Sequence, residues 1–405
     1  MLTTDTRSVR VRTQDSRFEG GFSLVELLVG MLVSLICVLA MMAAFAAFEG
    51  PKRTTTSGDD AQQNGSYSLY ELERQIRTAG SGFTQGENYG VWGCSIAGYY
   101  SSSQTMPSTQ AFPIPFDKWP QSGASLPIAT LAMPVLIASG GADGSGNALP
   151  DIIAIAAGNP AGTVFKSTIQ STPDASTVVL DNALGIYAND YLLATTTAGN
   201  CVMGMAATIT AASNQVSLSA ANSPSSGFIG GKYVFDLGAQ PTFSLYGVYN
   251  PASGNTSSLV TYDLLKRSGN VTQAISDGIV TIKALYGVDD GATTASIPGS
   301  GQANDGIIDE WVAPTGATWG INAILASQAN AATLYPQIKA IRLVVVARSQ
   351  LPERTADYST GSATLTLFPD LPAALRYTIT TQPQYRYKVY DTTIPIHNAI
   401  INRWF

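Results

Sequence analysis

Charged side chains are scarce in this sequence, and the basic ones do not cluster. The 405 residues include 22 Lys and Arg against 28 Asp and Glu, so the net charge is −6 and only 12% of the chain is charged. A nucleic-acid partner is not expected, because phosphate binding requires clustered Lys and Arg. A single histidine, His397, and three cysteines leave little material for a zinc site or for histidine-dependent catalysis. These shortages argue against a conventional enzyme.

The abundant residue types indicate a folded and exported protein. Hydrophobic residues make up 45% of the chain, which is too many for a wholly disordered one. The length allows two or three domain-sized units with a sizeable core. The many Gly, Ser, Thr and Asn residues favour a β-rich protein outside the cytoplasm.

An uncharged run near the N-terminus predicts a membrane-spanning helix. Leu27 to Phe48 contains 22 residues without a charge, and at about 1.5 Å per residue such a helix crosses the roughly 30 Å apolar core of a bilayer. Four arginines precede it, so residues 50–405 are expected outside the cytoplasm. One alternative is a Sec signal peptide cut at Ala44-Phe45-Ala46, although its apolar region is usually shorter. Another is a plain single-pass anchor, which leaves the residues just before the run unexplained.

The junction from Gly21 to Val29 (GFSLVELLV) resembles the class III signal of type IV prepilins and pseudopilins. The resemblance implies that a membrane prepilin peptidase cuts between Gly21 and Phe22 and that Phe22 is then N-methylated. It also makes Glu26 the hallmark acid at the fifth mature position. An acid in a membrane segment is costly, so it marks a functional position. In a fibre, Glu26 is expected to pair with the amine of Phe22 on a neighbouring subunit; alternatively, it rests at headgroup level at little cost.

A second, amphipathic helix is predicted over residues 50–82. Leu69, Leu72 and Ile76 lie at i, i+3 and i+7, which places them on one helix face. Gly80 and Gly82 are expected to end it.

Short β-like runs recur from residue 151 onward, separated by turn residues. Their spacing favours antiparallel sheet over βαβ units. A short helix is predicted at Ala323–Ala332. The predicted strands are Ile152–Ala156, Thr177–Leu180, Tyr191–Thr195, Ala207–Thr210, Gln215–Leu218, Tyr233–Leu237, Thr242–Tyr249, Leu259–Leu264, Ile279–Tyr286, Ala340–Ala347 and Tyr385–Ile396.

Four further segments resemble the PilW family of minor pilins. The resemblance implies a pilin-like α+β fold, in which a long N-terminal helix with a transmembrane first half packs on an antiparallel β-sheet with an enlarged β-rich head. The implied parts are a cleaved leader (1–21), a transmembrane helix (22–49), an amphipathic periplasmic helix (50–82) and a globular head (83–405). The segments are Leu69–Gly80 followed by Gly93-Cys94, Asp277–Asp289, Ile338–Ser349, and Tyr385–Asn398 with His397 where the family usually has Arg.

Two cysteines lie in the expected periplasmic part, where disulfides persist. A bond between Cys94 and Cys201 closes a loop of about 107 residues, which stabilises by roughly 4–5 kcal/mol on the chain-entropy model. Two isolated thiols are the alternative. The third cysteine, Cys37, lies in the apolar run and is expected to be a small buried hydrophobe.

Acidic residues cluster around the Gly-, Ser- and Thr-rich insertion 291–302. Calcium takes six to eight oxygen ligands, but the EF-hand pattern is absent because Ile307 and Ile308 follow Asp305-Gly306. A solvated acidic turn is the favoured interpretation, calcium is the alternative, and no other cofactor is expected. No nucleophile-elbow motif occurs, and His397 has no acid or nucleophile at motif spacing, so no catalytic residue is expected. The candidate calcium ligands are Asp289, Asp290, Asp305 and Asp309, with Asn304 and Glu310 beside them.

The PilW resemblance implies a non-catalytic minor pilin that primes or caps a type IV pilus. Implied partners are the other minor pilins, the major pilin, a large tip adhesin, the prepilin peptidase and the inner-membrane assembly platform. The protein is expected in the inner membrane with its head in the periplasm, and after assembly in the fibre or at its tip. The alternatives are a minor pseudopilin of a type II secretion system and, from another class, a membrane-anchored periplasmic enzyme or glycan-binding module.

Overall fold

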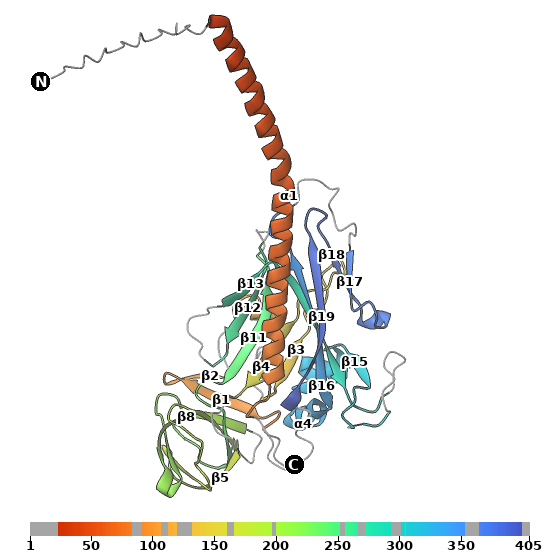
Figure 1. The fold of residues 1–405 in the computed structure, drawn as a ribbon. Coiled ribbons are helices and arrows are strands. Elements are labelled where there is room, and N and C mark those ends of the chain that lie inside the picture. The colour runs from red at the N-terminus through yellow and green to blue at the C-terminus, as the bar shows by residue number, and fades with distance from the viewer. Residues whose placement is uncertain are drawn as a thin grey trace, which may run out of the picture. The chain divides into compact units, whose positions relative to one another are not determined.

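A single long helix, α1, runs from Leu24 to Thr78 (Figure 1). This computed structural model describes residues 23–82, 91–106, 112–119, 132–159, 166–196, 200–251, 256–265, 272–292, 301–303, 305–352 and 364–398. The chain divides into two compact units, Met1–Arg53 and Thr54–Phe405, and each contains part of α1. Gly21 and Phe22, the expected processing site, lie outside the described residues.

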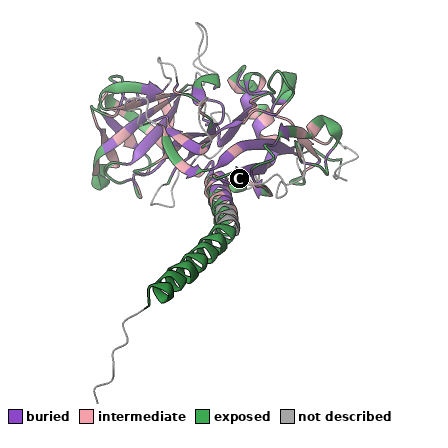
Figure 2. Ribbon diagram, turned by 90° about the horizontal axis from the view of Figure 1, so that it is seen from above, coloured by how far each residue is buried: buried purple, intermediate pink, exposed green. Residues whose placement is uncertain are grey.

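The first part of α1, Leu24–Phe48, is exposed along its whole length (Figure 2). Leu, Met and Ala dominate it, and these residues lose little conformational entropy in a helix. Its 25 residues are long and apolar enough to cross a membrane. The predicted apolar helix is therefore present.

The second unit contains two antiparallel sheets and a hairpin beside the barrel described below. One sheet has the order β13-β12-β11-β4-β3 and the other β15-β14-β16-β19. Buried side chains of both sheets share one core with Leu72 and Ile76 of α1, while Leu285 and Val344 face a second core under the β17–β18 hairpin. The strands are β3 (Val135–Ala138), β4 (Ile152–Ala157), β11 (Thr242–Tyr249), β12 (Ser258–Asp263), β13 (Gln273–Asp277), β14 (Ile279–Val288), β15 (Glu310–Val312), β16 (Ile338–Arg348), β17 (Thr364–Leu367), β18 (Tyr377–Thr380) and β19 (Tyr387–Pro395).

The second part of α1 packs on these strands through one face. Its buried residues are Ala61, Gly65, Ser68, Leu72 and Ile76, spaced by four, three, four and four positions, whereas most residues between them are exposed or half-buried. This spacing follows the 3.6-residue helical period, so this part of α1 is amphipathic; it continues the apolar part without a break and ends at Thr78, short of the expected residue 82.

The close contact at Gly65 depends on the missing side chain, because a Cβ there would overlap the Tyr390 ring of β19. The Tyr390 hydroxyl also donates a hydrogen bond to the Gln62 carbonyl, 2.9 Å away. At the end of α1, Gly80 has φ +79° and its N–H donates to the Ala156 carbonyl of β4 at 2.8 Å. Both ends of this stretch are thus tied to the sheets.

A closed six-stranded barrel lies between β4 and β11 in the chain, and the sequence analysis did not anticipate it. Its strands follow the order β8-β7-β10-β5-β6-β9, and β9 pairs again with β8. The barrel has its own core, which includes Leu192, Phe228 and Val234. The hairpin of β1 and β2 pairs with the start of β8, and β1 and β8 are parallel, not antiparallel as expected. The bounds are β1 (Ser95–Tyr100), β2 (Ser103–Met106), β5 (Lys166–Asp174), β6 (Thr177–Leu180), β7 (Tyr191–Thr196), β8 (Asn200–Thr210), β9 (Gln215–Leu218) and β10 (Gly231–Asp236).

The short helix expected at Ala323–Ala332 is split in two. A new helix starts after Ser327, whose hydroxyl accepts the Asn330 N–H at 3.1 Å, a side-chain cap that favours a helix start at this point. The short helices are α2 (Gly316–Trp319), α3 (Ile321–Ile324) and α4 (Gln328–Leu334), and 3-10 turns occupy Phe116–Lys118, Ala211–Ser213, Tyr335–Gln337 and Ala373–Leu375.

Candidate functional site

The apolar segment of α1, Leu24–Phe48, exposes a continuous run of hydrophobic side chains. Leu24 is 77% exposed and Phe45 is 75% exposed. Glu26 is the one charged residue between positions 23 and 48, and it lies in the first helical turn, where its N–H donates to the Ser23 carbonyl at 3.0 Å. A carboxylate is favoured at this end of a helix because the backbone N–H groups there are unpaired. Cys37, expected to be buried, is exposed here, because none of the described residues packs against this segment.

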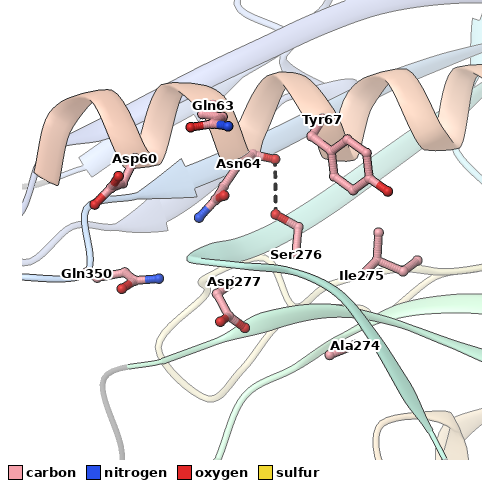
Figure 3. A pocket seen from close by; sticks show the side chains of 9 residues that line it. All are labelled: Asp60, Gln63, Asn64, Tyr67, Ala274, Ile275, Ser276, Asp277 and Gln350. Atoms are coloured by element: carbon pink, nitrogen blue, oxygen red, sulfur yellow. Dashed lines mark hydrogen bonds between the residues drawn. The ribbon is translucent and has the colours of Figure 1, made fainter. Parts of the chain in front are cut away.

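A polar groove of about 740 Å³ runs between α1 and β13 in the second unit (Figure 3). The Ser276 hydroxyl donates to the Asn64 carbonyl at 3.2 Å and fixes the two walls to each other. Asp60 and Asp277 supply carboxylates, the Tyr67 ring is 51% exposed, and none of the described lining residues is basic. The groove can therefore accept hydrogen bonds from a polar partner, but it does not suit an anion.

Cys94 and Cys201 form a disulfide, the pairing that the sequence analysis favoured over isolated thiols. Their Cα atoms are 5.6 Å apart and both side chains are buried. Cys94 directly precedes β1 and Cys201 lies in β8, with Ile96 opposite Cys201 in the parallel pairing. The bond therefore fastens the barrel to the chain segment that follows α1.

The acidic residues near position 300 are not a uniformly solvated turn. Asp289 and Asp309 are fully buried, which corrects that expectation. The Asp289 carboxylate accepts the N–H of Gly306 at 2.8 Å, and the ammonium group of Lys339 lies 3.6 Å away. Asp309 accepts the N–H of Gly291 at 2.8 Å. Backbone donors and a lysine thus compensate charges that the sequence alone suggested would face solvent.

Asp290 and Asp305 accept hydrogen bonds within their own turns, and the nearby Glu310 has a raised pKa. Asp290 accepts the Ala292 N–H at 3.0 Å, and Asp305 accepts the Ile307 N–H at 2.8 Å. Burial and the neighbouring Asp290 and Asp309 raise the pKa of Glu310. Asn304 lies outside the described residues, and among the described ones no group of three or more His, Cys, Asp and Glu side chains is placed to hold a metal. Calcium stays an untested alternative.

His397 lies beside the end of α1. Its Nε2 is 3.5 Å from an Arg77 guanidinium nitrogen, and the next residue, Asn398, donates its side-chain N–H to the Ala79 carbonyl at 2.8 Å. The PilW-like C-terminal segment therefore lies against the PilW-like end of the helix, although 319 positions separate Ala79 from Asn398 in the chain.

Residues 245–398 match the family model of PilW, the type IV pilus-assembly protein W. Through this region, the chain is similar to the PilW family. No curated protein and no solved structure matches the chain. The match relates the protein to type IV pilus assembly, and together with the apolar segment of α1 it indicates membrane anchoring.

The PilW region begins within β11 and extends through β19, so it includes the whole β15-β14-β16-β19 sheet. Three of the four PilW-like segments noted in the sequence lie within it. The barrel and α1 lie outside it. The PilW part of the fold is thus the sheet on which α1 packs through Gly65 and Tyr390.

The PilW region also contains a buried ion pair that the sequence analysis missed. Lys283 of β14 contacts the carboxylate of Asp151, the residue just before β4, and both side chains have no exposed surface. The available signal was a lysine as the one charged residue in the mostly apolar run Ile279–Tyr286. A lone lysine in such a run is buried only if a partner reaches it, and the partner lies 132 positions away in the sequence.

Proposed function

We propose that this protein is a minor pilin, a non-catalytic subunit that primes or caps a type IV pilus. The observation that carries the proposal is the combination of a PilW match with an exposed apolar helix that has a single acid, Glu26, in its first turn. A helix of this kind suits two environments in succession, a bilayer before assembly and a bundle of similar helices afterwards.

Processing is part of the proposal. The prepilin peptidase removes residues 1–21 by cutting after Gly21, and the new N-terminal residue, Phe22, is methylated. The free amine then lies four residues from Glu26 along the chain, and in a bundle it can pair with the Glu26 carboxylate of a neighbour. The pair forms where water is excluded, so its Coulomb energy is sensitive to the register of the helices.

The proposed location follows from the same elements. Before assembly, α1 holds the protein in the inner membrane with the head in the periplasm, where the Cys94–Cys201 disulfide persists. The partners are the other minor pilins, the major pilin, a large tip adhesin, the prepilin peptidase and the inner-membrane assembly platform. After assembly, the protein lies in the fibre or at its tip.

Deletion of the gene in its own cells tests this function. We expect few surface fibres, restoration of their number by the wild-type chain, and the protein in small amounts in sheared fibres. Type II secretion, measured in the same cells, should be unchanged. A deletion strain with a normal number of fibres, together with absence of the protein from sheared wild-type fibres, would refute the minor-pilin role. Loss of secretion with normal fibres would assign the chain to a secretion pseudopilus instead.

A further inference from the structure

The buried pair of Lys283 and Asp151 joins the two sheets of the second unit. Lys283 lies in β14, and Asp151 directly precedes β4 of the other sheet. Neither side chain has exposed surface. The Asp151 backbone N–H donates to the Ile282 carbonyl at 2.9 Å, so the backbones on both sides of the pair are held together as well. The ammonium group of Lys283 and the carboxylate of Asp151 are thus held in contact and away from solvent.

An ion pair in this environment is costly to keep charged. Transfer of each ion out of water costs several kcal/mol, and the mutual attraction offsets this only in part. The Lys283 Nζ lies 4.4 Å from the centroid of the Tyr377 ring, so one side of the ammonium group faces an aromatic ring. Burial raises the pKa of the Asp151 carboxyl even with Lys283 beside it. The surroundings therefore favour transfer of a proton from the ammonium to the carboxylate, which leaves a neutral amine next to a carboxylic acid.

The carboxyl group is oriented for attack by that amine. Its Oδ1 contacts Lys283 and accepts the Gly140 N–H at 3.0 Å, whereas its Oδ2 accepts the Ala284 N–H at 2.9 Å. The Lys283 nitrogen also donates to the Leu149 carbonyl at 3.3 Å, which limits its rotation. A backbone N–H at Oδ2 stabilises the negative charge that develops there when a nucleophile adds to the carboxyl carbon.

We propose that Lys283 and Asp151 condense to an intramolecular amide that cross-links β14 to the start of β4. The Lys283 Nζ forms a bond to Asp151 Cγ, and Oδ2 carries the negative charge of the intermediate beside the Ala284 N–H. The bond from Cγ to Oδ1 then breaks, and Oδ1 leaves as water with two of the three protons of the original ammonium. The products are one amide and one water, so no oxidant, metal or other reactant is needed.

Confinement supplies the driving force for this condensation. Groups fixed in contact react as if at effective concentrations on the order of 10⁵ to 10⁸ M, and exclusion of water slows the reverse hydrolysis. The amide also removes both charges from the core, because it replaces them with a neutral group. The bond does not depend on the pilus role proposed above.

Peptide mass mapping of the full-length wild-type protein, denatured and reduced before trypsin, tests the proposal. A free Lys283 is cleaved, which gives separate peptides 119–166, 268–283 and 284–339. An acylated Lys283 is not cleaved, so we expect one branched species that joins 119–166 to 268–339 and weighs one water less than their sum. Complete cleavage after Lys283, with peptide 119–166 at full mass, would overturn the proposal.

The chain provides matched controls. Lys339, also buried near an aspartate but 3.6 Å from it, should be cleaved completely in the same digest. The variants Lys283→Arg and Asp151→Ala should both lose the branched peptide, and Lys283→Arg should restore cleavage at position 283. A branched peptide that survives in Asp151→Ala would place the acceptor elsewhere and overturn the assignment. If either variant fails to fold, the wild-type digest still decides.

Discussion

Asp236, at the end of β10, has a buried carboxyl group of which only one oxygen has a hydrogen-bond partner. Its Oδ1 accepts the Gly238 N–H at 2.9 Å, whereas Oδ2 has no partner among the described residues. Burial, with a further contribution from the Asp190 carboxylate, raises the pKa of Asp236 from 3.8 to about 6. The folded state thus holds this proton at pH values where the unfolded chain has already lost it. The stabilisation from this proton is complete below pH 3.8 and is lost as the pH rises through about 6.

We therefore expect Asp236→Asn to raise the stability of the second unit at pH 7.5, by up to about 3 kcal/mol. The amide keeps an acceptor for Gly238 and removes the buried charge, so the gain should shrink as the pH falls toward 4. Thermal unfolding of the detergent-solubilised protein between pH 4.5 and 7.5 measures both effects. The control is Asp174→Asn, because Asp174 is an exposed barrel residue whose pKa is lowered by its hydrogen bonds with Ser176, and its loss should not stabilise. A less stable Asp236→Asn protein at pH 7.5 would contradict the expectation.

At Glu26, we expect replacement by Ala to leave peptidase cleavage intact and to reduce incorporation into fibres. The cut depends on Gly21 and its immediate flank, which the change does not touch. Apolar contacts between helices set their register weakly in lipid, whereas a charge pair depends on it strongly. The ratio of protein in sheared fibres to protein in the membrane measures incorporation. Glu26→Gln, which keeps the shape without the charge, should show the same defect; equal incorporation of all three proteins would leave Glu26 as a bystander at headgroup level.

At the scale of elements, the segments with regular apolar spacing could be predicted, including the four-residue strands β6 and β9, whereas polar strands such as β5 could not. The buried face of α1 and the long strands β14 and β16 follow directly from apolar spacing, since both faces of these strands are buried. Strand β5 was missed because its sequence, KSTIQSTPD, is polar and contains a proline. Asp289 was misjudged because its burial depends on N–H groups of Asp305 and Gly306 that only the folded loop brings to it.

The packing of α1 on the sheet leads to a prediction about the stability of a Gly65 variant. Gly65→Ala should destabilise the second unit by about 1–3 kcal/mol, because its Cβ must displace the Tyr390 ring and disturb the hydrogen bond to Gln62. Gly30→Ala is the matched control on the same helix, since a Cβ there has no atom within 4 Å and Ala is the better helix former. Denaturant unfolding compares the two. A stable Gly65→Ala protein would show that α1 does not pack as described.

At the scale of the whole molecule, the sequence could not predict that the strands close into a barrel. The closure depends on β9 pairing with β8 as well as with β6, and pairing partners are not encoded in the local pattern of either strand. The Cys94–Cys201 bond was the long-range contact that could be predicted, because the head was expected in an oxidising compartment and contains two cysteines to pair. The PilW resemblance likewise indicated type IV pilus assembly, but it did not indicate the order of the strands.

Removal of the disulfide should loosen the barrel. The double variant Cys94→Ser, Cys201→Ser is expected to lose about 2–5 kcal/mol of unfolding free energy, since a native cross-link over a long loop restricts the unfolded chain. Cys37→Ser, at the free cysteine of the apolar segment, should leave the second unit unchanged. Unfolding curves under non-reducing conditions compare the three proteins. Identical midpoints for wild type and double variant would show that the bond contributes no stability.

The chain enters and leaves the barrel at neighbouring points of one sheet. Strands β4 and β11, which precede and follow them in the chain, pair directly, with Ala157 opposite Thr242. Just beyond this pair, the Asn159 N–H donates to the Leu237 carbonyl at 2.7 Å, so the two connecting strands meet as the ends of a hairpin do. The hydrogen-bonded ladder of the sheet is therefore continuous without the barrel, which has a core of its own. In topological terms the barrel is an insertion at a single hairpin, but Leu193, Met203 and Phe235 of its strands also enter the core beneath the sheets, so that core needs the inserted strands to be filled.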